Sequence, residues 1–428
     1  MITFDNLYDV YLETRANKRR SDDSIDYEIH YERNLLQLKD AIDNHSLRPS
    51  AYTFIANYPR PREVFACDFN SRLCHHYIAR VTAPAMEKRM TSRSFNNRKG
   101  YGPLEAVNQL MEDIYEVSQG YTRDCWIIGC DIEGYFPNIS QDIAYVQQLD
   151  LLKDYHGADR DELLYMLQAS IYANPAEHCY RKTGIEQWAA KIVPKKSLMT
   201  KPEGIGGAIG FLIWQMALNY YLNDIDKKMV DTYGLHYVRY VDDMRWVVED
   251  KEAFLTLLPE LRKDLAKLHC TLHPRKFTCQ HYSKGTTFIG YHIKPYRVHR
   301  DNRVLRSALI KVHQLNHHPR PAQIEKFLCT VNSYIGMLKC CNDYKKVMRI
   351  VDAVNPKWLT FVHFDRKRLC YNANPGYTHK ELLAKKYGVK MRKLQRPPKG
   401  GNSYKGRNHI DNNYDTKRTI SARREQKT

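Results

Sequence analysis

The pattern of apolar and polar positions changes along the chain, and each change predicts a different element of secondary structure. After Pro103, which suits the first turn of a helix, apolar residues return at helical spacing. A short apolar run, Trp126–Cys130, ends at Asp131, as in a buried strand with a carboxylate at its end. Further on, apolar and aromatic segments flank Asp242 and Asp243, which predicts a strand, a tight turn and a second strand.

The remaining segments continue this succession of helices and strands. Residues 1–45 are predicted to be helical, and the segment Ser50–Ile78 is predicted to be extended because Pro59 and Pro61 punctuate it. A helical region should end at about Ala173, before an Asn-Pro step. The other predicted elements are helices at Phe211–Tyr233, Glu252–Leu268 and Ala322–Ala353, and a hairpin at Phe288–Ile293 and Val298–Leu305. This order predicts an α+β fold.

The composition is that of a soluble globular protein. The chain has 428 residues, of which 43% are hydrophobic and 27% charged. No apolar stretch approaches the roughly 20 residues that span a bilayer, and the first residues lack the apolar segment of a signal peptide. The eleven cysteines show no C-x-x-C spacing, which disfavours a disulfide scaffold or a cysteine-rich zinc site. We therefore expect a cytoplasmic protein without membrane association.

The net charge of the chain indicates what kind of partner it binds. Sixty-seven Lys and Arg against 48 Asp and Glu give a net charge of +19, which calls for a polyanion such as nucleic acid. The segment Lys385–Thr428 holds 14 basic and 3 acidic residues and therefore carries +11, leaving +8 for the rest. With few apolar residues and several helix breakers, this segment is predicted to be a mostly disordered, phosphate-binding arm, the alternative being a solubilising tail.

Three carboxylates form the sharpest chemical pattern. Asp131 ends one predicted strand, and Asp242 and Asp243 occupy the turn between two others. Nucleotidyl transfer by two Mg²⁺ ions needs carboxylates of this kind, because they bridge the ions while substrate phosphates complete the ligand sets. The alternative is a solvated acidic turn, since Asp favours turns in its own right. The apolar and aromatic strands on both sides of Asp242 and Asp243 favour the metal site.

These residues resemble a known family. Tyr240-Val241-Asp242-Asp243 resembles the YxDD box of reverse transcriptases, and Asp131–Ile139 resembles their other catalytic strand. The resemblance covers about residues 50–350 and implies a right-hand polymerase fold with fingers, palm and helical thumb, followed here by a basic C-terminal tail. It makes Asp131, Asp242, Asp243 and the backbone carbonyl of Ile132 ligands of two Mg²⁺ ions, with Mn²⁺ as an alternative, and Tyr240 a nucleic-acid contact.

The same resemblance assigns residues to the incoming nucleotide. Arg62 matches the strongest triphosphate-binding arginine, and Arg60 is its candidate assistant. Phe136 matches the aromatic residue that lies under the sugar and excludes a 2′ hydroxyl, the alternative being an ordinary core Phe. Lys276 is a candidate proton donor to the leaving pyrophosphate, or else a surface lysine. His75, beside the fingers motif, fits packing or RNA contact equally.

Other basic residues are implied to contact template or primer. Arg98 and Lys99 belong to an R-K-G-x-G element that the family places near the nucleic-acid backbone. Lys311 and Lys345 are expected on the thumb, near phosphates of the template–primer duplex. The implied regions are 1–125 (N-terminal region and fingers, with 140–205 partly fingers), 126–305 (palm), 306–365 (thumb) and 366–428 (basic extension).

Several blocks point to one subfamily. Ile209–Gln215, with the sequence IGFLIWQ, resembles the I-G-x-x-x-S-Q block of reverse transcriptases from diversity-generating retroelements, except that Trp214 replaces the usual Ser. Pro194–Leu198 resembles their P-x-K-S-L block, and the resemblance implies that Lys196 in it contacts nucleic acid. Later blocks of the same kind are His273–Phe277, Phe288–Pro295 and Asn332–Tyr344. Trp214 is expected either to reshape the wall of the nucleotide site or to fill helix packing.

The subfamily implies a particular function. Its members copy a template-repeat RNA into cDNA from a primer and dNTPs, misincorporate opposite template adenines, and work with a small, basic, helical accessory protein. Ile209, Gly210 and Gln215 would contact the nucleotide, and Ile209 would relax selection because isoleucine cannot hydrogen-bond as the usual glutamine does. The alternatives are another bacterial reverse transcriptase (retron, group II intron or phage-defence type) or a catalytically idle RNA-binding scaffold.

Overall fold

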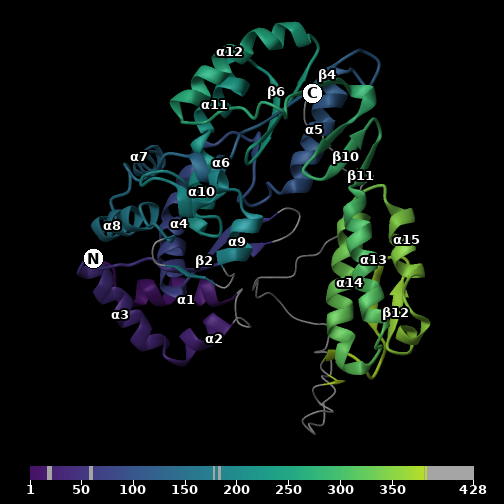
Figure 1. The fold of residues 1–428 in the computed structure, drawn as a ribbon, viewed down its shortest axis with the longest axis horizontal. Helices are drawn as coiled ribbons and strands as arrows, with labels where there is room; N and C mark the ends of the chain where they lie inside the picture. The colour runs from purple at the N-terminus through teal and green to yellow at the C-terminus, as the bar shows by residue number, and fades with distance from the viewer. Residues whose placement is uncertain (17–21, 57–60, 177–178, 182–184, 380, 383–428) are drawn as a thin grey trace, which may run out of the picture.

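The computed structural model describes residues 1–16, 22–56, 61–176, 179–181, 185–379 and 381–382 (Figure 1). Arg60, Pro59 and the basic segment Lys385–Thr428 lie outside the described residues. Within the described ranges, no helix combines the length and the apolar composition needed to cross a membrane.

A five-stranded sheet forms the centre of the fold. Its strands, in spatial order, are β3 (Ser94–Phe95), β6 (His236–Tyr240), β7 (Asp243–Val248), β4 (Trp126–Asp131) and β8 (Thr278–His281). β3 runs parallel to β6, and all other neighbours are antiparallel. The predicted strand that ends at Asp131 and the predicted strand–turn–strand around Asp242 and Asp243 are confirmed, and they are neighbours in this sheet.

Four helices cover the two faces of this sheet: α5 (Pro103–Val117), α10 (Leu212–Tyr221), α11 (Asn223–Lys227) and α12 (Lys251–Lys267). Alternate residues of a strand point to opposite faces, so each face has its own core. Val238 and Val247 pack with α5 on one face. Tyr237 and Trp246 belong to the larger core on the other face, which includes residues of α10, α11 and α12.

The N-terminal part of the chain is helical, as predicted, and leads into a second, smaller sheet. Its elements are α1 (Phe4–Ala16), α2 (Asp22–Ile29), α3 (Tyr31–Asp43), β1 (Ala51–Ala56), β2 (Arg62–Cys67), α4 (Phe69–Arg89) and β5 (Cys179–Arg181). The prediction of extended chain as far as Ile78 is wrong, because the strand stops at Cys67. Asp68 accepts a hydrogen bond from the Ser71 backbone N–H (2.7 Å) and so caps the N-terminus of α4.

Short helices follow β4 and lead back to this N-terminal part. They are α6 (Tyr135–Asn138), α7 (Gln141–Leu151), α8 (Arg160–Ile171) and α9 (Ile185–Lys191). The predicted helical region ends where expected, since α8 stops before Asn174. The predicted helix over Phe211–Tyr233 is divided at Leu222, between α10 and α11.

The last quarter of the described chain forms a hairpin sheet and a helical unit, which we define as residues 302–373. The elements are β9 (Thr286–Phe288), β10 (Tyr291–Lys294), β11 (Arg297–Arg300), α13 (Asn302–Asn316), α14 (Ile324–Lys339), α15 (Tyr344–Asp352), β12 (Val362–Asp365) and β13 (Cys370–Ala373). The predicted second strand ends at Arg300 rather than Leu305, because the Asp301 side chain caps α13.

The helical unit has a hydrophobic core of its own. Phe327 of α14 stacks on Trp358 (ring centroids 4.4 Å apart) and meets Tyr371 of β13 edge-on (5.3 Å). The β12–β13 hairpin therefore packs as part of this unit, although β13 lies beyond residue 365, where the thumb was predicted to end. The domain boundaries stay predictions.

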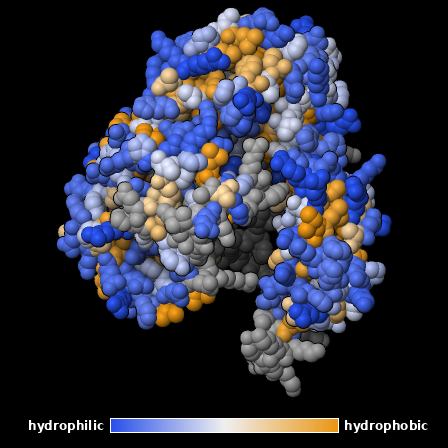
Figure 2. All heavy atoms as spheres, in the orientation of Figure 1, coloured by the Kyte–Doolittle hydropathy of each residue, from blue (hydrophilic) through white to orange (hydrophobic). Residues whose placement is uncertain are grey.

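Hydrogen bonds between β11 and the loop from α14 to α15 connect the helical unit to the hairpin sheet. Val298 and Asn342 exchange two hydrogen bonds of 2.9 Å, and the buried Asp343 carboxylate accepts the Arg300 backbone N–H (2.6 Å). Elsewhere the described residues of the unit lie apart from the rest of the described chain in Figure 1, and described residues of both parts border a hollow on the face shown in Figure 2.

Candidate active site

Strand pairing brings the three predicted carboxylates to one end of the central sheet. Asp131, the last residue of β4, lies directly opposite Asp243, the first residue of β7. Asp242 precedes Asp243 in the turn from β6, and its carbonyl accepts the Ile132 backbone N–H (3.3 Å). Residues more than one hundred positions apart in the sequence therefore share one site.

Two basic side chains neutralise this site in part. Lys276 forms an ion pair with the Asp131 carboxylate, and Arg245 forms one with Asp243. Burial raises the pKa of Asp243 to about 6, although Arg245 opposes that shift. Burial also raises the pKa of Asp242, against the lowering influence of Arg62. Two carboxylates with raised pKa values side by side are the environment that a bound cation would stabilise.

The donor set fits hard cations, but the carboxylates are not gathered around a single point. In the described part of the chain, one group of three His, Cys, Asp or Glu residues has ligand atoms all within 4.8 Å of one another, and it is not Asp131, Asp242 and Asp243. The ion pairs account for this, because Asp131 turns to Lys276 and Asp243 turns to Arg245. Carboxylate and carbonyl oxygens are the ligands that Mg²⁺ and Mn²⁺ prefer, so a cation would compete with these two basic groups.

The glycine loop, which contains Gly204, Gly206, Gly207 and Gly210, lies beside β2 and α6. The Ile209 carbonyl accepts the Phe65 N–H of β2 (2.7 Å), and the Phe136 carbonyl accepts the Gly207 N–H (2.8 Å). Gly210 has φ +113°, and a Cβ there would lie 2.3 Å from the Phe65 carbonyl oxygen, so only glycine fits. The predicted nucleotide-binding residues Phe136, Ile209 and Gly210 are thus brought together. Whether they bind nucleotide stays a prediction.

Trp214 lies in α10, the helix that follows this loop, and its burial distinguishes the two expectations for it. The Trp214 side chain is 1% exposed. A Cβ on Gly207 would lie 2.7 Å from the indole ring, so the ring occupies the space that the glycine leaves. The indole therefore fills packing rather than lining an open wall. Gln215, next in α10, is half-buried, and its carbonyl accepts the Asn97 side-chain N–H (3.1 Å).

A buried carboxylate that sequence analysis missed holds the segment around Lys196. Glu63 of β2 is 5% exposed and accepts hydrogen bonds from the Trp188 indole (2.9 Å), the Ser197 hydroxyl (2.6 Å) and the Leu198 N–H (2.6 Å). This ties the P-K-K-S-L block to the strand that carries Arg62. Lys196 itself is exposed. The pattern gave no signal for Glu63, since its partners are more than one hundred residues away.

Arg98 is the predicted nucleic-acid contact whose surroundings differ most from expectation. Its side chain is only 6% exposed, and its guanidinium donates to the carbonyls of Thr91 and Ser94 (both 2.7 Å) and pairs with Glu87 (2.6 Å). The guanidinium also lies over the Tyr101 ring (3.8 Å). These contacts commit Arg98 to the protein interior.

The other predicted contacts are placed as follows. His75 is fully buried against Phe211 (ring centroids 5.0 Å apart), and burial lowers its pKa to about 3, so the packing interpretation is confirmed. Tyr240 is half-buried beside the carboxylate turn. Arg62, Lys99, Lys276, Lys311 and Lys345 are exposed. Binding of nucleic acid by the lysines and Tyr240 stays a prediction.

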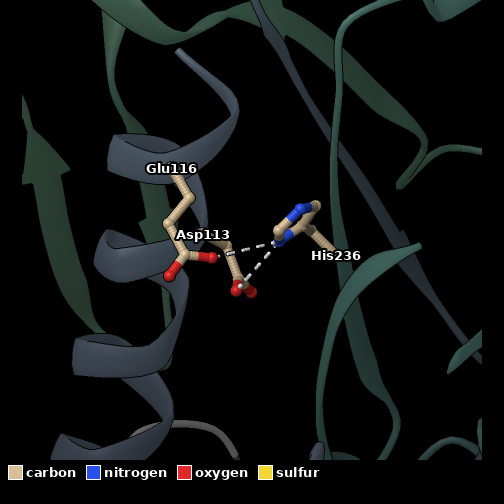
Figure 3. A group of neighbouring side chains, drawn as sticks. All are labelled: Asp113, Glu116 and His236. Atoms are coloured by element: carbon tan, nitrogen blue, oxygen red, sulfur yellow. Dashed lines mark hydrogen bonds and ion pairs between the residues drawn. The ribbon is translucent and has the colours of Figure 1, made fainter. Parts of the chain in front are cut away.

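The three residues that do converge are Asp113, Glu116 and His236 (Figure 3). Asp113 of α5 is fully buried and pairs with Arg93 (2.6 Å), and His236 Nδ1 lies 3.4 Å from the same carboxylate. Hydrogen bonding to Asp113 raises the pKa of His236. His236 begins β6, so this group lies about 13 Å along the strand from the catalytic turn and is separate from the predicted metal site.

A sheet whose adjacent strands end in facing carboxylates, with helices on both faces and a separate helical unit, is typical of nucleic-acid polymerases. The chain belongs to the reverse transcriptase (RNA-dependent DNA polymerase) family, which matches residues 76–293. Members of this family are RNA-directed DNA polymerases and hence nucleotidyltransferases. The predicted α+β, right-hand polymerase fold is confirmed.

Solved structures of telomerases are also similar. Apo telomerase from Candida tropicalis, truncated from its C-terminal domain, is 12% identical with a TM-score of 0.41, covering 63% of this chain and 60% of that one. Telomerase from the same organism in complex with a TWJ fragment of telomeric RNA is 11% identical with a TM-score of 0.44, covering 76% and 58%. The chain thus spans no more than 60% of these relatives. None of the curated proteins matches the sequence.

Proposed function

We propose that the protein is a reverse transcriptase that copies RNA into cDNA by two-metal nucleotidyl transfer. One observation carries the proposal: Asp131 and Asp243 face each other on paired strands, with Asp242 adjacent. Together with the Ile132 carbonyl, these carboxylates would hold two Mg²⁺ ions, or Mn²⁺ in their place. Bound metals would lower the pKa of a 3′ hydroxyl and neutralise the charge of the triphosphate.

The other residues of the site have roles that follow from their position. Arg62 is exposed on β2, near Asp242, where its guanidinium can bind a triphosphate bidentately. Lys276 forms an ion pair with Asp131, which places its ammonium group where it can donate a proton to the leaving pyrophosphate. Phe136, held through its carbonyl by Gly207, would lie against the sugar of the incoming dNTP and leave no room for a 2′ hydroxyl.

Primer extension on an RNA template tests the polymerase. Wild-type protein with Mg²⁺ should extend a DNA primer, and Asp242→Ala should lower the rate by several orders of magnitude because a metal ligand is lost. Asp231→Ala is the control. Asp231 is an exposed aspartate in the segment before β6, at the opposite end of that strand from Asp242. Equal extension by wild type and Asp242→Ala would favour the idle RNA-binding scaffold instead.

We further propose that the enzyme belongs to a bacterial diversity-generating retroelement and copies a template-repeat RNA with a small, basic, helical accessory protein. The support is the Ile209–Gln215 block and the Pro194–Leu198 block, which β2 holds next to each other through Phe65 and Glu63. A retron, group II intron or phage-defence enzyme is the alternative. A neighbouring gene for the accessory protein and a repeat of the template would favour our proposal.

The frequency of misincorporation opposite template adenine, measured in variants of Ile209, tests the assignment to diversity-generating retroelements. The Ile209 side chain is half-buried, in a loop whose backbone is fixed by Phe65. Ile209→Gln restores a hydrogen-bonding group there and should lower misincorporation opposite template adenine in sequenced cDNA. Ile209→Leu, which remains apolar, serves as the control and should keep the wild-type spectrum. An unchanged adenine error frequency in Ile209→Gln would contradict this role.

A further inference from the structure

We propose that Arg239 and Asp226 are positioning residues of the catalytic site: their buried ion pair holds the Tyr240–Asp243 turn in the shape that presents Asp242 and Asp243. The inference rests on the proposed function of those carboxylates. Neither residue hydrogen-bonds to these carboxylates, so the structural contact is with the backbone of the turn, and the charge of Arg239 additionally lowers the pKa of Asp242.

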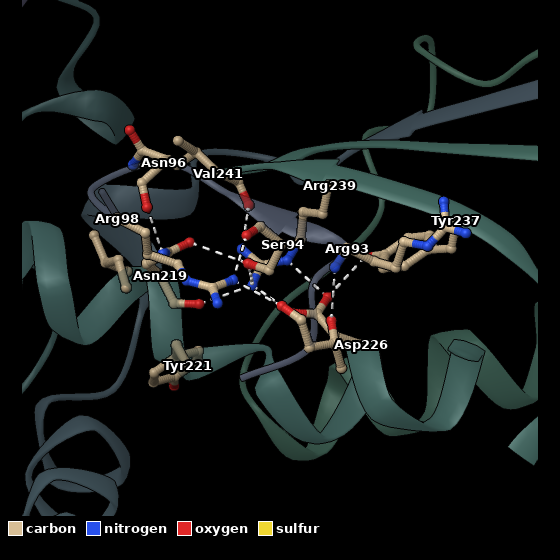
Figure 4. Close-up of polar contacts among 12 residues, drawn as sticks. Arg93, Ser94, Asn96, Arg98, Asn219, Tyr221, Asp226, Tyr237, Arg239 and Val241 are labelled. Carbon is tan, nitrogen blue, oxygen red and sulfur yellow. Dashed lines mark hydrogen bonds and ion pairs between the residues drawn. The ribbon is translucent and has the colours of Figure 1, made fainter. Parts of the chain in front are cut away.

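Arg239 and Asp226 form a closed network behind the turn (Figure 4). Arg239 of β6 and Asp226 of α11 are both fully buried. The guanidinium donates to both carboxylate oxygens of Asp226 (2.8 and 2.5 Å), and the Tyr237 hydroxyl donates to the same carboxylate (2.9 Å). A bidentate pair of this kind has one favoured orientation. Asp226 therefore fixes the direction in which Arg239 presents its remaining N–H groups.

Those remaining groups reach three elements. Nη2 donates to the Ser94 hydroxyl of β3 (2.8 Å) and the Asn219 carbonyl of α10 (2.7 Å), while Nη1 donates to the Val241 carbonyl (2.9 Å). The last contact is to the backbone of the catalytic turn itself. One side chain thus joins a helix and an edge strand to the residue that precedes Asp242.

The turn needs such support because its backbone is strained. Val241 has φ +59°, in the left-handed region that a β-branched residue rarely occupies. Conformations of this kind persist where the surroundings over-determine them. The hydrogen bond from Arg239 to the Val241 carbonyl orients the peptide that leads into Asp242, and therefore opposes relaxation of the turn.

The burial of a charged pair, rather than of two apolar residues, also favours a positioning role for Arg239 and Asp226. Burying an ion pair costs desolvation that apolar residues of the same size avoid, so such a pair is weak evidence for stability alone. The chain offers an internal comparison: Arg93 and Asp113 pair near the start of β6, on the face of the sheet that α5 covers, also with a fully buried carboxylate. Among the described residues, neither of their side chains is hydrogen-bonded or ion-paired to the turn. Of the two ion pairs, the one formed by Arg239 and Asp226 is hydrogen-bonded to the Val241 carbonyl.

Hydrogen exchange of the metal-free protein, followed by mass spectrometry, tests the inference. Asp226→Asn keeps the side-chain shape but removes the charge, and Arg239→Lys keeps the charge but cannot span the contacts. In both, amides of peptides covering residues 240–243 should exchange about tenfold faster. Asp113→Asn, the matched control, should leave these amides as in wild type. Wild-type exchange in the turn of folded Asp226→Asn, or equal acceleration in Asp113→Asn, overturns the proposal.

Activity provides a second readout that a purely structural role would not change. Relative to wild type, Asp226→Asn should need several-fold more Mn²⁺ for half-maximal extension and have a kcat lowered about 10- to 100-fold, with an unchanged KM for template–primer. Equal losses in Asp113→Asn contradict the inference. If the wild type does not extend primers, the proposed function fails, but the exchange experiment still decides whether Arg239 and Asp226 hold the turn.

Discussion

The close contact between Gly207 and Trp214 allows a quantitative prediction about the stability of the glycine loop. A methyl group on Gly207 would lie 2.7 Å from two atoms of the indole, closer than side-chain carbons approach. Trp214 is 1% exposed in the largest core, so the ring has no free space into which to move. Gly207→Ala should therefore destabilise the protein by about 1–3 kcal/mol, the usual cost of overpacking.

Removing the indole should cancel that cost. Trp214→Ala alone should lower the free energy of unfolding by about 3–5 kcal/mol, because it leaves a large buried cavity. In the double variant, the added methyl of Gly207→Ala enters the cavity rather than clashing. The double variant should be no less stable than Trp214→Ala, which gives a coupling energy of about 1–3 kcal/mol.

Urea unfolding followed by circular dichroism at 222 nm measures these differences. Gly336→Ala is the control, because nothing lies within 4 Å of a Cβ there and the residue is inside α14, where alanine is the better helix former by up to about 1 kcal/mol. It should stabilise the protein. If Gly207→Ala were as stable as wild type, or if its cost simply added to that of Trp214→Ala, the packing explanation for Trp214 would be refuted.

Three further predictions concern the site. Because Asp243 has a pKa raised to about 6 and must be ionised to bind a cation, Mn²⁺ affinity measured by calorimetry should fall about tenfold from pH 7.5 to pH 5; a flat profile would contradict this. Gly210→Ala should cost more stability in urea than Gly100→Ala, which shares a positive φ but meets no atom within 4 Å; equal costs would show the Phe65 clash to be unimportant. Glu63→Gln should cost about 1–3 kcal/mol in the same assay, since an amide cannot accept from all three donors; unchanged stability would refute the network.

The strands of the active site were predictable because their signals are local. The apolar run before Asp131 is buried on both faces, and the two segments around Asp242 pair with each other directly. The N-cap at Asp68 also has a local signal, because Asp is among the residues preferred at that position of a helix.

The remaining features depend on partners distant in sequence. The neutralisation of Asp131 by Lys276, the buried Glu63 and the inward direction of Arg98 follow from tertiary contacts that no periodicity reveals. Arg98 is a basic residue in a glycine-containing loop, as is common for residues that contact phosphate. Its guanidinium instead donates to three acceptors within the protein. Residue type alone does not distinguish these cases.

The pairing of Asp131 with Asp243 also has a consequence for how the active site forms during folding. The two residues are separated by more than one hundred positions, and β4 lies between β7 and β8, which both follow it in the chain. Loop-closure entropy makes such long-range pairing slow compared with local helix formation. During synthesis, Asp131 leaves the ribosome well before its partner strands. Catalytic competence should therefore appear late in folding, after most of the chain has already gained helical structure.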